Sequence, residues 1–108
     1  MSEVMPPPPN IPEGLEHLLP QFVAEMLKDS ATLSGLLGGS LEEMGEHAHA
    51  MRGKAGLFGE DHLYDLLSRL ERMAMDGCAE GMADLCAQVI ERSNQLAVYG
   101  QLPAAGQS

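Results

Sequence analysis

The chain is poor in aromatic residues and in positive charge. It has no Trp, two Phe and two Tyr among 108 residues, so its apolar content rests mainly on Leu, Met, Ala and Val, which favour helices over strands. Six Lys and Arg stand against 16 Asp and Glu, giving a formal net charge of −10. Binding a nucleic acid or an anionic membrane surface requires a basic face, and this charge balance argues against both partners.

Long apolar runs and a bridging cysteine pair are also missing. No run approaches the roughly 18 apolar residues that span a bilayer. The N-terminus lacks the basic start and apolar stretch of a secretory signal. Cys78 and Cys86 fall on one expected helix, too far apart along its axis to form a disulfide. We therefore expect reduced thiols and a cytoplasmic protein.

Apolar residues recur at helical spacing, and proline and glycine separate the segments that carry them. No segment alternates with the period of a strand. We expect a flexible Pro-rich arm over residues 1–11, a helical bundle over 12–100 and a loose tail over 101–108. The bundle is predicted to contain a short helix with Pro12 in its first turn and four longer helices over about 20–37, 41–57, 61–75 and 78–99. Short connections favour antiparallel neighbours, so the predicted fold is an all-α, up-and-down four-helix bundle.

The second long helix carries glycines where a helix interior disfavours them. At 100° per residue, one stripe of this helix contains Gly45, His49, Gly53 and Gly56. Each interior glycine costs about 1 kcal/mol relative to alanine. The stripe indicates clearance, because side chains beside His49 would block a large partner that must reach its imidazole. His49 itself falls at the border between the apolar face and solvent.

Positive charge gathers near this histidine. The second and third helices hold four of the six cations, namely Arg52, Lys54, Arg69 and Arg72. An arginine beside a histidine disfavours the charged imidazolium and can hydrogen-bond a phosphoryl group. Both effects suit a neutral imidazole that attacks phosphorus and then carries an anion.

A metal site would be another use of these histidines. His47 and His49 are two residues apart and diverge on a helix, whereas zinc-binding pairs need a spacing of three or four. His47 is interpreted as a solvent-exposed residue on the far side of the helix from His49. We therefore expect no metal site in this chain.

The segment Ala48-His49-x-x-Arg52-Gly53-x-Ala55-x-x-x-Gly59 resembles the signature of histidine-containing phosphotransfer (HPt) domains. That family usually has lysine where this chain has Arg52. Leu19-Pro20-x-Phe22 resembles the start of the family's first helix, and Leu70-Glu71 resembles a Leu-Glu pair on the helix after the histidine. The resemblance covers roughly residues 18–96. It implies a four-helix module that passes phosphoryl groups between receiver-domain aspartates.

The resemblance also implies roles for individual residues. His49 would be phosphorylated on its outer ring nitrogen, Arg52 would stabilise the phosphoryl group, and Glu71 would orient the imidazole through the other nitrogen. Gly59 would shape the end of the helix. The surface on which a receiver domain docks would include Gly45, Gly53, Lys54 and Gly56.

The function expected from this resemblance is that of a phosphocarrier in a two-component phosphorelay. Its partners would be response-regulator receiver domains or a hybrid histidine kinase. It would have no ATP site and no cofactor of its own, since the Mg²⁺ for transfer is expected in the partner receiver. We also expect a monomer and a complete small protein.

Two alternatives to this relay stay open at the level of sequence. One is a phosphotransfer module phosphorylated directly by a histidine kinase domain, as in chemotaxis kinases. Phe58-Gly59 after Ala55-Gly56 resembles the version of the motif found in those kinases. The other is a helical adaptor that binds a receiver domain without chemistry.

Overall fold

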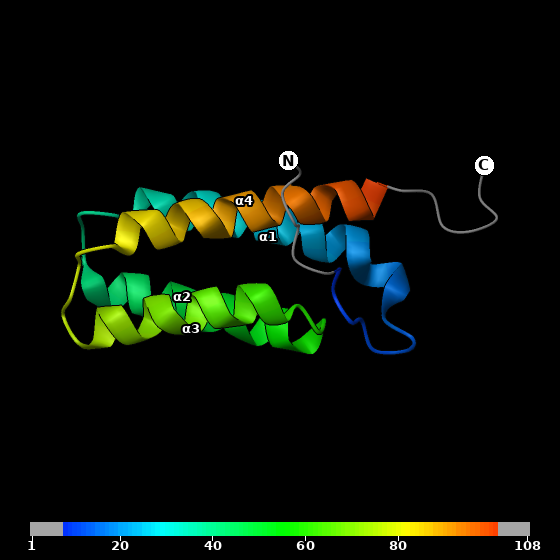
Figure 1. Ribbon diagram of the computed structural model, residues 1–108, viewed down its shortest axis with the longest axis horizontal. Helices are drawn as coiled ribbons and strands as arrows, with labels where there is room; N and C mark the ends of the chain where they lie inside the picture. Colours follow the sequence, from blue (N-terminus) through cyan, green and yellow to red (C-terminus); the bar gives the residue numbers. More distant parts are fainter. Residues whose placement is uncertain (1–7, 102–108) are drawn as a thin grey trace, which may run out of the picture.

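Four helices run antiparallel to their chain neighbours, as Figure 1 shows. The computed structural model describes residues 8–101. Its elements are the 3₁₀ turn η1 (Glu16–Leu18) and the α-helices α1 (Leu19–Gly35), α2 (Leu41–Leu57), α3 (Asp61–Met75) and α4 (Met82–Gln101). No strand occurs within residues 8–101. The predicted all-α four-helix bundle is confirmed.

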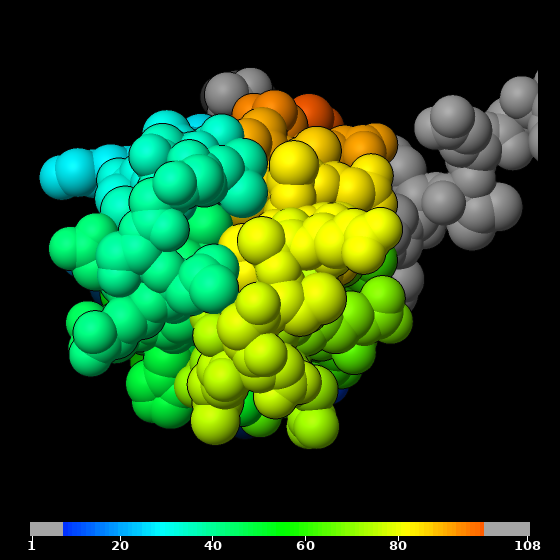
Figure 2. All heavy atoms as spheres, turned by 90° about the vertical axis from the view of Figure 1, so that its left-hand side faces the viewer, coloured from blue at the N-terminus to red at the C-terminus, as the bar shows by residue number. Residues whose placement is uncertain are grey.

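The helices form two pairs, α1 beside α4 and α2 beside α3 (Figure 1). Buried apolar side chains from all four helices fill the space between the pairs, among them Met26, Met51, Leu67 and Val89. Phe22 and Phe58 stack with their ring centroids 4.4 Å apart. The α1–α2 and α3–α4 connections lie side by side at one end of the bundle (Figure 2), which leaves the α2–α3 turn at the other.

Most predicted helix boundaries agree with the structure. Pro20 lies in the first turn of α1, where a missing backbone N–H costs nothing. The Ser40 side chain caps α2 by accepting a hydrogen bond from the Glu43 backbone N–H. Helix α3 has the predicted bounds, and α2 ends at Leu57 as expected.

Several helix boundaries differ from the prediction, among them the end of α4, which lies at Gln101 rather than near residue 99. The short helix predicted around Pro12 is a single 3₁₀ turn over Glu16–Leu18, and α1 ends at Gly35 rather than near Leu37. Helix α4 begins at Met82 rather than near Cys78. Gly77 and Gly81 have φ angles of +72° and +88°, a left-handed conformation that a right-handed helix cannot contain.

The ends of the chain are described only in part. Residues 1–7 of the predicted arm and residues 102–108 of the predicted tail lie outside the described residues. Within the arm, the Asn10 backbone N–H donates to the Gly59 carbonyl at 3.0 Å, and Ile11 packs against the core. Helix α4 continues to Gln101. No helix among residues 8–101 is long and apolar enough to cross a bilayer.

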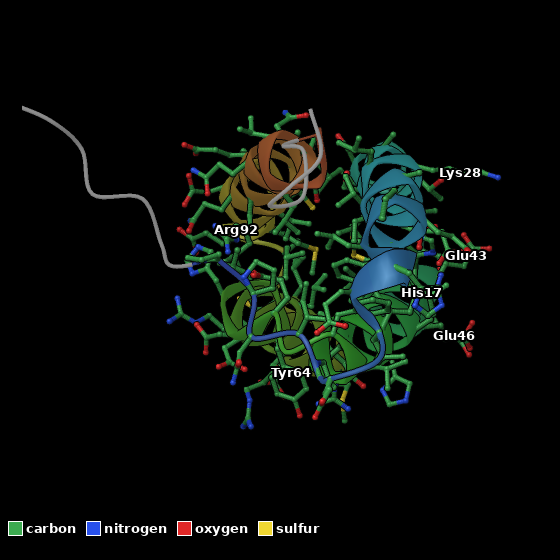
Figure 3. The ribbon with its side chains drawn as sticks, turned by 90° about the vertical axis from the view of Figure 1, so that its right-hand side faces the viewer. His17, Lys28, Glu43, Glu46, Tyr64 and Arg92 are labelled. Carbon is green, nitrogen blue, oxygen red and sulfur yellow. The ribbon has the colours of Figure 1, made fainter. Side chains whose placement is uncertain are left out.

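A buried ion pair fixes the α2–α3 turn to α4. The Glu60 carboxylate caps α3 by accepting from the Leu63 backbone N–H, and it also accepts from Arg92 Nε at 2.9 Å and Nη2 at 2.7 Å. Both side chains are 1% exposed. Arg92 lies between α3 and α4 in the end-on view of Figure 3. This pair holds the end of the bundle where α2 turns into α3.

The Glu60–Arg92 pair predicts a large loss of stability when its cation is removed. We expect Arg92→Met to lower the free energy of unfolding by roughly 3–5 kcal/mol, because the Glu60 carboxylate would stay buried without its partner. Arg69 pairs with Asp65 on the surface, so Arg69→Met is the matched control, with an expected loss of under about 1 kcal/mol. Urea denaturation of both variants measures the difference; equal losses would contradict the assignment.

Gly59 predicts a second, steric effect on stability. Its φ is +68°, and an added Cβ would lie 1.9 Å from the Asn10 carbonyl oxygen. Gly14 also has a positive φ, +93°, but no atom of residues 8–101 lies within 4 Å of its added Cβ. We expect Gly59→Ala to cost roughly 2–3 kcal/mol and Gly14→Ala about 1 kcal/mol by thermal or urea unfolding. A cost no greater at Gly59 than at Gly14 would show that residues 10 and 59 do not hold this contact.

Candidate functional site

His49 lies on α2 with its side chain 62% exposed, so its imidazole is open to a macromolecular partner. Its contacts are made through Nδ1. Among residues 8–101 the structure places no hydrogen-bond partner on Nε2. The ring is therefore held from one nitrogen while the other is available for chemistry.

Glu71 supplies the first contact to His49, from the neighbouring helix α3. Its Oε2 lies 2.8 Å from His49 Nδ1, and its side chain is 19% exposed. A carboxylate oxygen can only accept a hydrogen bond, so this contact favours the tautomer in which Nδ1 carries the proton. In that tautomer the lone pair is on Nε2.

Arg52, one turn after His49 on α2, lies beside both Nδ1 of His49 and the Glu71 carboxylate. Its Nη2 is 3.2 Å from His49 Nδ1, and its Nε is 3.4 Å from Glu71 Oε1. The guanidinium also lies over the Tyr64 ring of α3, 5.6 Å from the centroid, a cation–π distance. A fixed cation therefore stands beside the imidazole, as the sequence predicts.

The glycines of the stripe have two different environments. An added Cβ at Gly45 would lie 3.2 Å from Ala74 Cβ, and one at Gly56 would lie 3.3 Å from the Tyr64 ring. These two glycines let α2 approach α3 closely. At Gly53 no atom of the described residues lies within 4 Å of an added Cβ, so this glycine, unlike Gly45 and Gly56, leaves open space. The prediction of clearance therefore describes Gly53, whereas Gly45 and Gly56 face α3.

A mostly apolar groove of about 620 Å³ adjoins the imidazole. Its lining consists of His49 and the three acidic residues Glu42, Glu46 and Glu71, together with Leu41, Gly45, Ala74 and Met75. Met75 is 77% exposed, which is unusual for a large apolar side chain. The exposed ring thus lies at an apolar depression between α2 and α3.

Comparison with known protein families identifies this arrangement. The Hpt domain family matches residues 17–99, which is most of the chain. The chain belongs to the Hpt domain family. Hpt domains are phosphocarrier modules rather than kinases, and they interact with receiver domains in phosphorelays. Searches of curated proteins and of solved structures gave no match.

Lys54 lies on the other side of α2 of this Hpt domain. Its ammonium is 3.0 Å from the Asp29 carboxylate and 3.5 Å from that of Glu25, both on α1. The hydrogen bond to Asp29 is the main cause that raises the pKa of Lys54 above its ordinary value, against a smaller lowering by burial. The structure therefore joins Lys54 to α1 and does not bring it to the cluster around His49.

His47 is not the solvent-exposed residue that the sequence suggested. It is half-buried, and its Nε2 lies 3.0 Å from the Asp29 backbone carbonyl of α1. A carbonyl only accepts, so Nε2 must donate and its lone pair is not available for attack. This contact distinguishes the two histidines of α2. His47 links α2 to α1, whereas Nε2 of His49 has no hydrogen-bond partner in the described part of the chain.

Sequence reasoning missed Tyr64 as a neighbour of the site. It is 44% exposed and projects from α3 on the side of the bundle away from α1 and α4 (Figure 3). Its contacts with Arg52 and with the space left by Gly56 depend on how α2 and α3 align, and no local motif encodes that alignment.

Among residues 8–101 no cluster of three or more His, Cys, Asp or Glu could hold a metal ion.

The two kinds of glycine predict opposite effects of alanine on stability. We expect Gly53→Ala to raise the free energy of unfolding by about 0.5–1 kcal/mol, because alanine favours the helix and meets no neighbour. Gly45→Ala should gain none of this, since its Cβ would press on Ala74 in the α2–α3 interface. Denaturant unfolding of both variants tests the assignment, which a similar gain at the two positions would refute.

Proposed function

We propose that this Hpt domain accepts a phosphoryl group on His49 Nε2 from the aspartate of one receiver domain and passes it to the aspartate of another. The observation that carries the proposal is the pairing of an exposed imidazole with a carboxylate on Nδ1, at 2.8 Å. Such a contact fixes the tautomer and raises the nucleophilicity of the other nitrogen. His47, whose Nε2 faces a backbone carbonyl, lacks this arrangement.

In the proposed reaction, the Nε2 lone pair attacks phosphorus of the receiver's acyl phosphate in line with the bond to be broken. The phosphorus–oxygen bond breaks and the aspartate carboxylate leaves with the electron pair. Glu71 keeps the Nδ1 proton in place as positive charge develops on the ring. The Arg52 guanidinium can offset the phosphoryl charge through its planar donors. Mg²⁺ for the transfer belongs to the acidic pocket of the receiver.

The surface around His49 supports docking of a receiver over α2 and α3. The apolar groove lined by Leu41 and Met75 offers contact area on one side of the ring. Gly53, one turn beyond His49, leaves room for the partner's backbone to approach the imidazole. We propose that Gly45 and Gly56 contribute indirectly, by setting the distance between the two helices that form this surface.

The deciding experiment is phosphotransfer from a phosphorylated receiver in the presence of Mg²⁺. We expect label on the wild-type chain that is lost in acid and stable in base, as a phosphoimidazole requires. His49→Gln should abolish the label, while His47→Gln should retain it, although it loses the contact to Asp29. Label that persists in His49→Gln would overturn the proposal, as would an unlabelled wild-type chain.

A second candidate function is phosphorylation directly by a histidine kinase domain. The Glu71 contact favours it, because the resemblance to chemotaxis kinases includes a glutamate on the second imidazole nitrogen. Replacing the receiver by an isolated kinase domain and ATP separates the two. If only the kinase domain labels His49, the direct route holds. If His49→Gln still controls its partner normally without label, the chain acts as an adaptor.

A further inference from the structure

Nδ1 of His49 has two neighbours of opposite hydrogen-bonding character. The Glu71 carboxylate, 2.8 Å away, can only accept, and the Arg52 guanidinium, 3.2 Å away, can only donate. Nδ1 can satisfy one of them at a time: Glu71 when it carries a proton, Arg52 when it does not. The site therefore holds a partner for each protonation state of this nitrogen.

Arg52 forms an ion pair with Glu71 but no hydrogen bond, so its guanidinium can donate a hydrogen bond to Nδ1. Its Nε stands 3.4 Å from Glu71 Oε1, and that buried oxygen accepts no hydrogen bond from the described part of the chain. The Tyr64 ring supports the guanidinium from α3. The planar fork of the arginine points Nε at the Glu71 carboxylate and Nη2 at the imidazole.

Phosphorylation at Nε2 changes which hydrogen-bond partner suits Nδ1. Attack by the neutral ring leaves both nitrogens substituted, one by phosphorus and one by hydrogen, so the ring is a cation. Loss of the Nδ1 proton to solvent then gives a neutral phosphorylated ring whose Nδ1 carries a lone pair. The protonated ring is matched by Glu71, and the neutral ring is matched by Arg52.

The two forms differ in how readily the phosphorus–nitrogen bond breaks. When an acceptor oxygen attacks phosphorus, the electron pair of that bond returns to Nε2. The protonated ring then leaves as neutral imidazole, whereas the unprotonated ring would have to leave as an anion. The Nδ1-protonated form is therefore the one that transfers, and the unprotonated form is the one that stores.

We propose that Glu71 and Arg52 form a two-position switch on Nδ1 of His49, in which Glu71 holds the ring in its transferring form and Arg52 holds it in its storing form. The proposal deepens the proposed function and rests on it. Glu71 here favours both uptake and release of the phosphoryl group, while Arg52 lengthens the lifetime of the phosphorylated chain between them.

The test measures the phosphorylated full-length chain without any partner protein. The chain is phosphorylated with phosphoramidate, the donor is removed, and decay of phosphohistidine is followed by ³¹P NMR while ¹⁵N NMR reports the protonation of Nδ1. We expect Arg52→Met to shorten the phosphohistidine lifetime up to about tenfold and to shift Nδ1 toward the protonated signature. Glu71→Gln, whose amide can also donate to Nδ1, should lengthen the lifetime and shift Nδ1 the other way.

Matched controls separate this switch from general charge effects. Arg69→Met removes another arginine from α3, and Asp65→Asn removes the carboxylate that pairs with Arg69 on the same helix. Both should leave the lifetime and the ¹⁵N signature at wild-type values. Circular dichroism verifies that every variant is folded. We expect Arg52→Met to fold, because the Arg52 side chain is 30% exposed.

The outcomes distinguish the switch from the proposed function. If the wild-type chain takes no phosphoryl group on His49 from the small donor or from a receiver, the proposed function fails. If His49 is phosphorylated but Arg52→Met and Glu71→Gln keep the wild-type lifetime and Nδ1 signature, only the switch is overturned. Lifetimes that shift equally in the controls also overturn it.

Discussion

The close approach of α2 to α3 is the constraint on which the site depends. An added Cβ at Gly45 would lie 3.2 Å from Ala74 Cβ, and one at Gly56 would lie 3.3 Å from the Tyr64 ring. The absence of both side chains lets the two helices pack this closely. At this spacing the Glu71 carboxylate of α3 reaches Nδ1 of His49 at 2.8 Å. Wider separation would leave the imidazole without its orienting partner and Arg52 without the Tyr64 ring behind it.

The rest of the bundle holds these two helices while leaving their outer face open. The buried Glu60–Arg92 pair ties the α2–α3 turn to α4, and His47 and Lys54 tie α2 to α1 through Asp29. Polar contacts therefore hold the inner sides of the pair, whereas His49, Gly53 and the apolar groove remain exposed. This division leaves the imidazole on an exposed face that a partner can reach.

Local sequence patterns predicted the helices well where the signal was local. The Ser40 cap and the bounds of α3 follow from side chains within one or two turns of each other. The start of α4 was predicted too early, because the left-handed conformations of Gly77 and Gly81 place four residues outside the helix. The exposure of His47 was predicted wrongly because its partner lies 18 residues away on another helix.

The order of residues was enough to predict the four-helix plan, the histidine on a glycine-bearing face and a cation one turn away. All three follow from the 3.6-residue period, which relates only residues on the same helix. Three features required the packed bundle: Glu71 and Arg52 both contact Nδ1, Lys54 pairs with α1, and within residues 8–101 Gly53 faces open space while Gly45 and Gly56 face α3. These depend on the register and distance between helices, which arise from packing of the whole core.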